Sequence, residues 1–274
     1  MGLETQHSDA PGVKTVATEE GRYLYCIADA GEKVSLGEIG IEGNEVYTIP
    51  YNDICAVVHH CPAQPYHSDD HEVVKAWVVT HQVVVNAAWG KWGTVLPLTF
   101  DTIIKGESGS TAEQNVQDWL KQEYERLKGK MEKVRGKAEY GVQVFWNPEV
   151  TAQHLVETST GIRELEEEVA TKPRGLAYMY RQKLENLIKH RMETKAEECF
   201  EDFYHRIRKH VDDIRVEKTK TAGQDLQMIM NLSCLVYRDR CAELGEELEK
   251  INQMEGFSVR FTGPWPPYSF VESA

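Results

Sequence analysis

The sequence lacks the long apolar run and the leader segment that would mark a membrane or secreted protein. No stretch of the 274 residues approaches the ~18 consecutive apolar residues that a membrane-spanning helix needs. The first residues, Met1 to His7, have neither the basic start nor the apolar core of a signal peptide. We therefore expect a cytoplasmic protein that makes no contact with a membrane.

The sequence also lacks paired cysteines. Its six cysteines form no CxxC motif, and most lie within apolar segments. In a reducing compartment such residues serve as small buried hydrophobic side chains, so we expect no disulfide framework. They are Cys26, Cys55, Cys61, Cys199, Cys234 and Cys241.

Basic residues are scarce relative to acidic ones. The chain has 31 Lys and Arg against 44 Asp and Glu, a formal net charge of −13. Such a surface repels phosphate backbones, and the basic residues from Lys128 to Lys137 are accompanied by Glu123, Glu125 and Glu132. We therefore expect no nucleic-acid partner. The hydrophobic content of 41% is sufficient for a packed core.

The signatures of common catalytic sites are absent as well. No GxSxG nucleophile motif occurs, and the loop from Gly106 to Ser110 has neither GxGxxG nor the lysine of a phosphate-binding loop. His81 falls on the apolar face of a predicted helix, where a satisfied core histidine is the simplest interpretation. The glutamates from Glu164 to Glu168 point in different directions around a helix. We predict a protein that is not an enzyme and holds no cofactor.

One segment, His59 to His71, is dense in potential metal ligands. His67 and His71 have a spacing that suits a metal on one helix face, but Ser68 has the character of the helix cap and would leave His67 outside the helix. The simplest interpretation is a polar connector. The alternative is a metal-dependent enzyme that uses His60, Cys61, His67 and His71.

The residue pattern predicts an α+β protein with two domains. Residues 1–20 are polar and predict a disordered tail. Residues 21–147 alternate apolar strands with two amphipathic helices, which favours a ferredoxin-like sandwich. Residues 148–274 predict a C-terminal α+β domain with long helices. In its last part, the strand 226–236, the helix 241–251 and the strand 257–261 form a βαβ unit.

The end of the chain is its most distinctive segment. The run Gly263-Pro264-Trp265-Pro266-Pro267-Tyr268-Ser269-Phe270 is held extended by its three prolines. It is either a clasp packed against its own domain or a preformed peptide that docks on a partner. Met228 and Met230 either fill a core or form an adaptable docking surface. The candidate partner-binding residues are Trp265, Tyr268, Met228 and Met230.

This ending resembles that of the gas vesicle protein F/L family. The resemblance spans Gly21 to Phe270 and includes the first strand, Gly21 to Ile27, and the segment Thr94 to Phe100. In that segment and directly after it, Thr99 and Asp101 stand where many members have Arg and Gly.

The resemblance implies a non-enzymatic protein that is needed to build gas vesicles, which are protein-walled flotation organelles. It implies a minor structural or assembly protein associated with the vesicle, whose partners are the small hydrophobic shell subunit and other gas vesicle accessory proteins. The fold that it implies is two α+β domains with a ferredoxin-like N-terminal domain.

Overall fold

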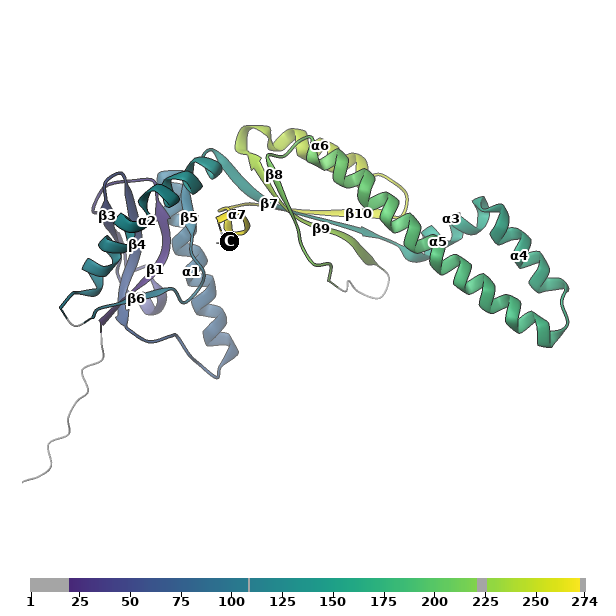
Figure 1. Ribbon diagram of the computed structural model, residues 1–274, viewed down its shortest axis with the longest axis horizontal. Coiled ribbons are helices and arrows are strands. Elements are labelled where there is room, and N and C mark those ends of the chain that lie inside the picture. The colour runs from purple at the N-terminus through teal and green to yellow at the C-terminus, as the bar shows by residue number, and fades with distance from the viewer. Residues whose placement is uncertain (1–19, 108, 221–225, 272–274) are drawn as a thin grey trace, which may run out of the picture. The chain divides into compact units, whose positions relative to one another are not determined.

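The computed structural model describes residues 20–107, 109–220 and 226–271 (Figure 1). The described chain divides into two compact units. The first consists of residues 20–26, Ala30–Val84 and Thr99–Tyr124, and the second of Ile27–Asp29, Val85–Leu98 and 125–271. The predicted disordered tail, residues 1–20, lies outside the described residues except for Glu20, which begins the first strand.

The first sheet has the strand order β2-β3-β4-β1-β5, and β6 pairs with β1. Strand β1 is central and is buried at every position after its first residue, which is why its sequence is apolar without alternation. The strands are β1 (Glu20–Ala28), β2 (Ser35–Gly37), β3 (Val46–Tyr51), β4 (Ile54–Pro62), β5 (Val95–Pro97) and β6 (Ile103–Lys105), with a short 3-10 turn at Ile41–Gly43.

Two long helices accompany this sheet, α1 (His71–Trp92) and α2 (Ala112–Val134). Each buries an apolar stripe at three- and four-residue spacing, which includes Val84 and Ala88 in α1. The cap of α1 differs from the sequence expectation. Asp70 Oδ1 accepts a hydrogen bond from the backbone N–H of Glu72 at 2.9 Å, so Asp70 and not Ser68 caps the helix.

The second sheet has the strand order β10-β7-β9-β8, and each neighbouring pair is antiparallel. Its strands are β7 (Lys137–Trp146), β8 (Asp213–Val216), β9 (Gln227–Tyr237) and β10 (Phe257–Trp265). The helices of this unit are α3 (Pro148–Thr158), α4 (Thr160–Thr171), α5 (Arg174–Arg208), α6 (Cys241–Asn252) and α7 (Tyr268–Val271), with a 3-10 turn at Arg238–Arg240.

The core of the second unit lies between the sheet and the helices α5 and α6. Alternate residues of β7 and β9, such as Val142, Val144 and Leu232, pack against Phe203 of α5 and Leu248 of α6. Strands β9 and β10 both run antiparallel to β7 and are therefore parallel to each other. The predicted unit of strand, crossover helix and strand is thus present, with β7 between its two strands.

The α+β class with two domains is confirmed. The ferredoxin-like strand order, however, occurs in the second unit and not in the N-terminal domain, where it was expected. In the second unit the elements run β-α-β-β-α-β and the strands lie in the order 4-1-3-2, which is the ferredoxin-like arrangement. The first sheet has a different order, because β2, β3 and β4 pair consecutively before the first long helix. Strand β7, which the sequence analysis assigned to the N-terminal domain, belongs to the second sheet.

Candidate functional site

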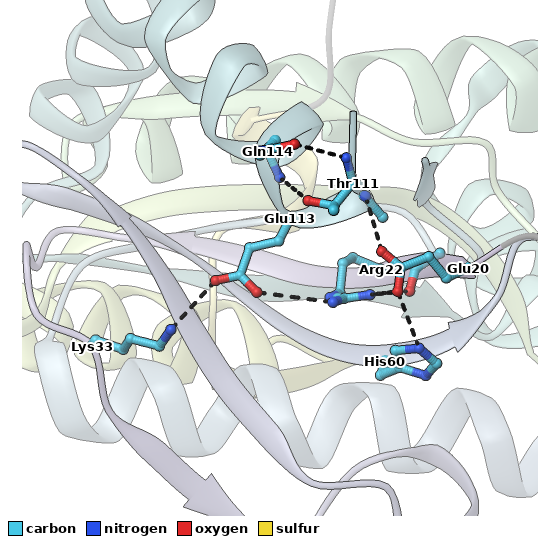
Figure 2. A network of polar contacts seen from close by, with 9 residues as sticks. Glu20, Arg22, Lys33, His60, Thr111, Glu113 and Gln114 are labelled. Atoms are coloured by element: carbon cyan, nitrogen blue, oxygen red, sulfur yellow. Dashed lines mark hydrogen bonds and ion pairs between the residues drawn. The ribbon is translucent and has the colours of Figure 1, made fainter. Parts of the chain in front are cut away.

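A polar network in the first unit fixes the start of α2 (Figure 2). Thr111 and Gln114 form a reciprocal capping box: Thr111 Oγ1 accepts from the N–H of Gln114 at 3.2 Å, and Gln114 Oε1 accepts from the N–H of Thr111 at 2.9 Å. Glu20 Oε1 accepts from the N–H of Ala112 at 3.2 Å. The first strand thereby supplies an additional carboxylate cap to the helix that follows it about ninety residues later in the sequence.

Ion pairs of alternating sign extend this network (Figure 2). The mostly buried Arg22 guanidinium lies 3.6 Å from a Glu20 carboxylate oxygen and 3.9 Å from Glu113. Lys33 lies 3.4 Å from Glu113, and His60 Nε2 lies 3.7 Å from Glu20. These groups neutralise one another and include no activated nucleophile, so the geometry supports a structural anchor between β1, β4 and α2.

The capping box gives the first prediction. Thr111→Ala removes the side-chain acceptor of the Gln114 N–H and is expected to lower the free energy of unfolding by about 1 kcal/mol. Chemical denaturation of both proteins measures this difference. Thr111→Ser, which retains the hydroxyl, is the matched control and should stay within about 0.5 kcal/mol of the parent chain. Equal losses in the two variants would contradict the capping role.

A second polar cluster is buried inside the first unit. The backbone N–H of Ile41 donates to the Tyr25 hydroxyl at 3.0 Å, and that hydroxyl lies 2.7 Å from His59 Nδ1. His59 Nε2 lies 2.9 Å from the Tyr66 hydroxyl. Because the Tyr25 hydroxyl already accepts the Ile41 N–H, the arrangement favours its donation to Nδ1 and a proton on Nε2 that is donated to Tyr66. Both ring nitrogens are therefore satisfied in the neutral state.

His81 occupies a matching position in this cluster. Its Nδ1 lies 2.8 Å from the Tyr23 hydroxyl, which accepts the N–H of Asp101 at 3.2 Å. Asp101 Oδ1 in turn accepts the N–H of Tyr66 at 3.0 Å, which holds the segment after β4 in place. The interpretation of His81 as a satisfied core histidine is confirmed, since only 3% of its surface is exposed.

Burial sets the protonation states of this cluster. Together with a smaller effect of the neighbouring His60, it lowers the pKa of His59 to about 4. Burial also raises the pKa values of the hydroxyls of Tyr23, Tyr25 and Tyr66, which stay protonated at neutral pH. Tyr23, Tyr25, His59 and Tyr66 are therefore uncharged at neutral pH, as buried groups without a charged partner must be.

The His59–His71 segment does not bring its potential ligands together. His60 joins the ion-pair network, Cys61 is buried in the core, and the imidazole of His67 is 85% exposed beside Asp69. Burial raises the pKa of the Cys61 thiol to about 11, which keeps it protonated. Within the described parts of the chain, no three His, Cys, Asp or Glu side chains are grouped so that they could hold a metal ion.

The cysteines have the expected structural role. All six are described, all are free thiols, and five are buried. Cys241, the sixth, is half-buried.

In the second unit, the C-terminal segment packs back on its own sheet. Ser269 donates its backbone N–H and its hydroxyl to the Glu139 carboxylate of β7, at 2.8 and 2.6 Å. The rings of Pro266 and Pro267 and the side chains of Phe270 and Val271 are buried. The clasp interpretation therefore describes this segment from Pro266 onward.

The C-terminal motif requires glycine at position 263 for a steric reason. Gly263 has a φ of 120°, and a Cβ there would lie 2.9 Å from the Glu139 carbonyl oxygen. Only glycine adopts this conformation at that distance from the neighbouring strand. This glycine lies in the irregular part of β10, between Thr262 and Trp265, just before the clasp begins.

The candidate partner-binding residues are divided between the surface and the core. Trp265 is 49% exposed and lines an open groove of ≈ 520 Å³ on the sheet, whereas Tyr268 is half-buried. Met230 is fully buried in the core, and Met228 is 8% exposed. In the sheet register Trp265 lies opposite Glu139, and Met228 lies opposite Phe145. Glu139 and Phe145 are about 20 Å apart along β7, so Trp265 and Met228 are separated by a similar distance. The four residues therefore do not form one surface.

Helix α1 has an exposed apolar face, which the sequence analysis missed. Val79 and Val83, one turn apart, are 50% and 51% exposed, and Val73 and Val78 on the same helix are also exposed. Between Ala76 and Gly90 the helix carries no Asp, Glu, Lys or Arg. The signal was present in the sequence, because this helix is apolar on more of its circumference than one buried face requires.

The comparisons with known proteins agree with this architecture. A family model described as gas vesicle synthesis protein GvpL/GvpF matches residues 21–272. The chain belongs to this family. It is 31% identical to gas vesicle protein L1 of Halobacterium salinarum over 281 aligned positions, which cover 97% of this chain and 98% of the relative. It is 26% identical to gas vesicle protein L of Haloferax mediterranei, with 96% of this chain and 91% of the relative covered.

Solved structures of family members have the same fold. The crystal structure of GvpF from Anabaena has a TM-score of 0.75 at 19% identity, and it covers 93% of this chain and 99% of that one. GvpF from Microcystis aeruginosa has a TM-score of 0.64 at 17% identity, with 92% and 99% covered. Family membership assigns this chain to gas vesicle synthesis. Among its described residues, no helix has both the length and the apolar character of a membrane span.

Proposed function

We propose that this protein supports gas vesicle formation by binding the small hydrophobic shell subunit, and that it does so without catalysing a reaction. The observation that carries the proposal is the exposed apolar face of α1, with Val79 and Val83 at its centre. Family membership supplies the biological setting, and this face supplies a surface that fits an apolar partner.

The composition of this face favours a helical partner. Ala76, Val79, Val83 and Ala87 follow one another at intervals of three and four residues, so they form a ridge along one side of α1. Small and β-branched side chains allow a second helix to approach closely. The chain as a whole carries a net charge of −13, whereas the segment from Ala76 to Gly90 has no Asp, Glu, Lys or Arg. Trp265 is a second candidate contact, in the second unit.

The double substitution Val79→Glu with Val83→Glu tests the proposal. We expect at least a tenfold loss of affinity for the co-expressed shell subunit, because two carboxylates would have to be desolvated at an apolar interface. Co-purification of the subunit with the tagged protein measures binding, and complementation of a deletion strain measures vesicle formation.

Val216→Glu is the matched control, since Val216 is an exposed valine of the second unit, 59% accessible. It should leave binding unchanged. Binding of the shell subunit at parental affinity to the double variant would contradict the role of α1. Normal vesicles in a strain without the protein would contradict the proposed function itself.

A further inference from the structure

An open groove with an apolar floor lies between α5 and the beginning of β9 in the second unit. Phe200 of α5 and Met228 and Ile229 of β9 form the floor, and the groove has a volume of ≈ 380 Å³. Phe200 and Ile229 are half-buried, and Met228 is 8% exposed. Part of their apolar surface therefore remains accessible from outside. The other uncharged residues of the lining are Ala196, Thr219 and Gln227.

A β-bulge at this point of β9 explains the floor of the groove. In the pairing with β7, Met230 lies opposite Val144. Met228 lies opposite Phe145, the next residue of β7, so the intervening Ile229 has no partner there. A bulge bends its strand and turns a side chain out of the strict alternation between the two faces. Two neighbouring residues, Met228 and Ile229, can therefore line the same groove.

The rim of the groove is acidic. Glu197 and Glu201 of α5 are the only charged residues in the described lining. They lie one turn apart on the same side of the helix, and both are exposed. Within the described chain neither carboxylate has an ion pair, whereas the neighbouring Glu198 pairs with Lys195. Like charges at this spacing repel each other, so a cation beside them would stabilise this part of α5.

The floor and the rim together restrict what the groove can bind. A phosphate group or an acidic peptide would be repelled by two carboxylates that have no compensating charge. A purely apolar segment would remove those carboxylates from water without giving them a partner, which costs free energy. A segment with an apolar side chain next to a positive charge satisfies both parts. The volume lies at the small end of ligand sites and suits a few side chains of such a segment.

We propose that this groove binds a short basic segment of a partner protein. The segment places an apolar side chain against Phe200 and Ile229 and a Lys or Arg beside Glu197 and Glu201. Apolar burial and charge pairing are partly offset by the ordering of the segment, so the dissociation constant should be about 100 µM. The groove is a different site from the α1 face, and the proposal does not depend on the function assigned to that face.

Titration of the full chain with short synthetic peptides tests the proposal. A peptide with Lys-Leu-Lys at its centre, flanked by glycine and serine, should bind with a dissociation constant of about 100 µM at about 0.05 M salt. A Lys-Ser-Lys peptide should bind about tenfold more weakly, because it retains the charges but has no apolar side chain. A Glu-Leu-Glu peptide should not bind. Isothermal titration calorimetry measures these affinities.

Charge reversal in the rim tests the position of the site. Glu197→Lys with Glu201→Lys should bind the Lys-Leu-Lys peptide about tenfold more weakly than the parent chain, and it should bind the Glu-Leu-Glu peptide instead. Such a gain of binding cannot result from misfolding. Hydrogen exchange of the segments 196–201 and 227–230 should slow when the matching peptide is bound.

Glu164→Lys with Glu168→Lys is the matched control. These two glutamates of α4 are exposed, have the same four-residue spacing and lie outside the groove. The control makes the same change in net charge as the rim variant. It should bind all of the peptides like the parent chain.

Three results would overturn the proposal. The first is no binding of the Lys-Leu-Lys peptide at about 1 mM. The second is equal binding of the Lys-Leu-Lys and Lys-Ser-Lys peptides, which would show attraction to the acidic chain as a whole. The third is an unchanged preference for the Lys-Leu-Lys peptide after the rim charges are reversed.

Discussion

Lowering the pH from 7 to 5 is expected to cost the parent protein about 2 kcal/mol more unfolding free energy than it costs a His59→Gln variant. The physical cause is the buried position of His59, whose pKa in the folded chain is about 4. In the unfolded chain a histidine has a pKa of about 6.5. The unfolded state therefore binds more protons between these two values.

The sign of the effect follows from that difference. The stability contributed by neutral His59 is fully present above pH ~6.5 and is lost as the pH falls toward ~4, where the folded state also protonates. The full loss over this range is about 3 kcal/mol, since one pKa unit corresponds to about 1.4 kcal/mol. Structurally, a protonated ring would place two donors against Tyr25 and Tyr66, and Tyr25 would lose the acceptor for its own proton.

Urea denaturation at pH 5, 6 and 7 measures this dependence, and near-UV circular dichroism reports on the tyrosines of the cluster. Hydrogen exchange of peptides from β4 assigns the loss to the first unit. His190→Gln is the control, because His190 is exposed on α5. It should keep the parental pH dependence. A His59→Gln variant with the same pH dependence as the parent chain would show that His59 is already protonated in the folded state at pH 5.

Phe270→Ala is expected to destabilise the second unit by about 3–4 kcal/mol. Phe270 is 4% exposed, and its ring has the Lys133 ammonium at 5.9 Å and the Arg215 guanidinium at 5.7 Å from its centroid. Truncation removes the buried ring and both cation–π contacts. It also weakens the two hydrogen bonds that Ser269 donates to the Glu139 carboxylate. Burial raises the pKa of that carboxyl group, so an unpaired Glu139 would be costly.

Trp265→Ala is the matched control for this prediction. Trp265 is a larger side chain five residues earlier, but it is half exposed, so its removal should cost only about 1 kcal/mol. Denaturation of the two variants, combined with hydrogen exchange of β7 peptides, measures both effects. A larger loss for Trp265→Ala than for Phe270→Ala would contradict the clasp and favour Trp265 as the main anchor of the segment.

Several elements could be predicted from sequence because their patterns are local. The eleven-residue alternation that predicted a strand at 226–236 corresponds to β9 (Gln227–Tyr237), and the apolar stripe from Leu176 to Ile207 corresponds to α5 (Arg174–Arg208). Other features were hidden. The helical segment after β7 is divided into two helices, α3 and α4, that meet at Ser159, and β6 (Ile103–Lys105) is too short to show a period.

The sequence pattern also did not decide which apolar residues form a docking surface and which form the core. Met228 and Met230 alternate along a strand, and this pattern is compatible with either a core or a docking face. The packing of α5 and α6 against the sheet buries them. The valines of α1 cover more of its circumference than one buried face requires, but only the tertiary structure shows which of them are exposed.

The sequence by itself determined the class of the fold, the elements with a strong period and the family, because these depend on local spacing and on one specific C-terminal motif. Only the tertiary structure decided that β7 joins the second sheet, that His59 and His81 are satisfied by tyrosines, and that the motif is a clasp with Trp265 left exposed. The physical reason is that strand partners and buried hydrogen bonds join residues far apart in the chain. Tyr25 and His59 are 34 positions apart, and Glu139 and Ser269 are 130 apart.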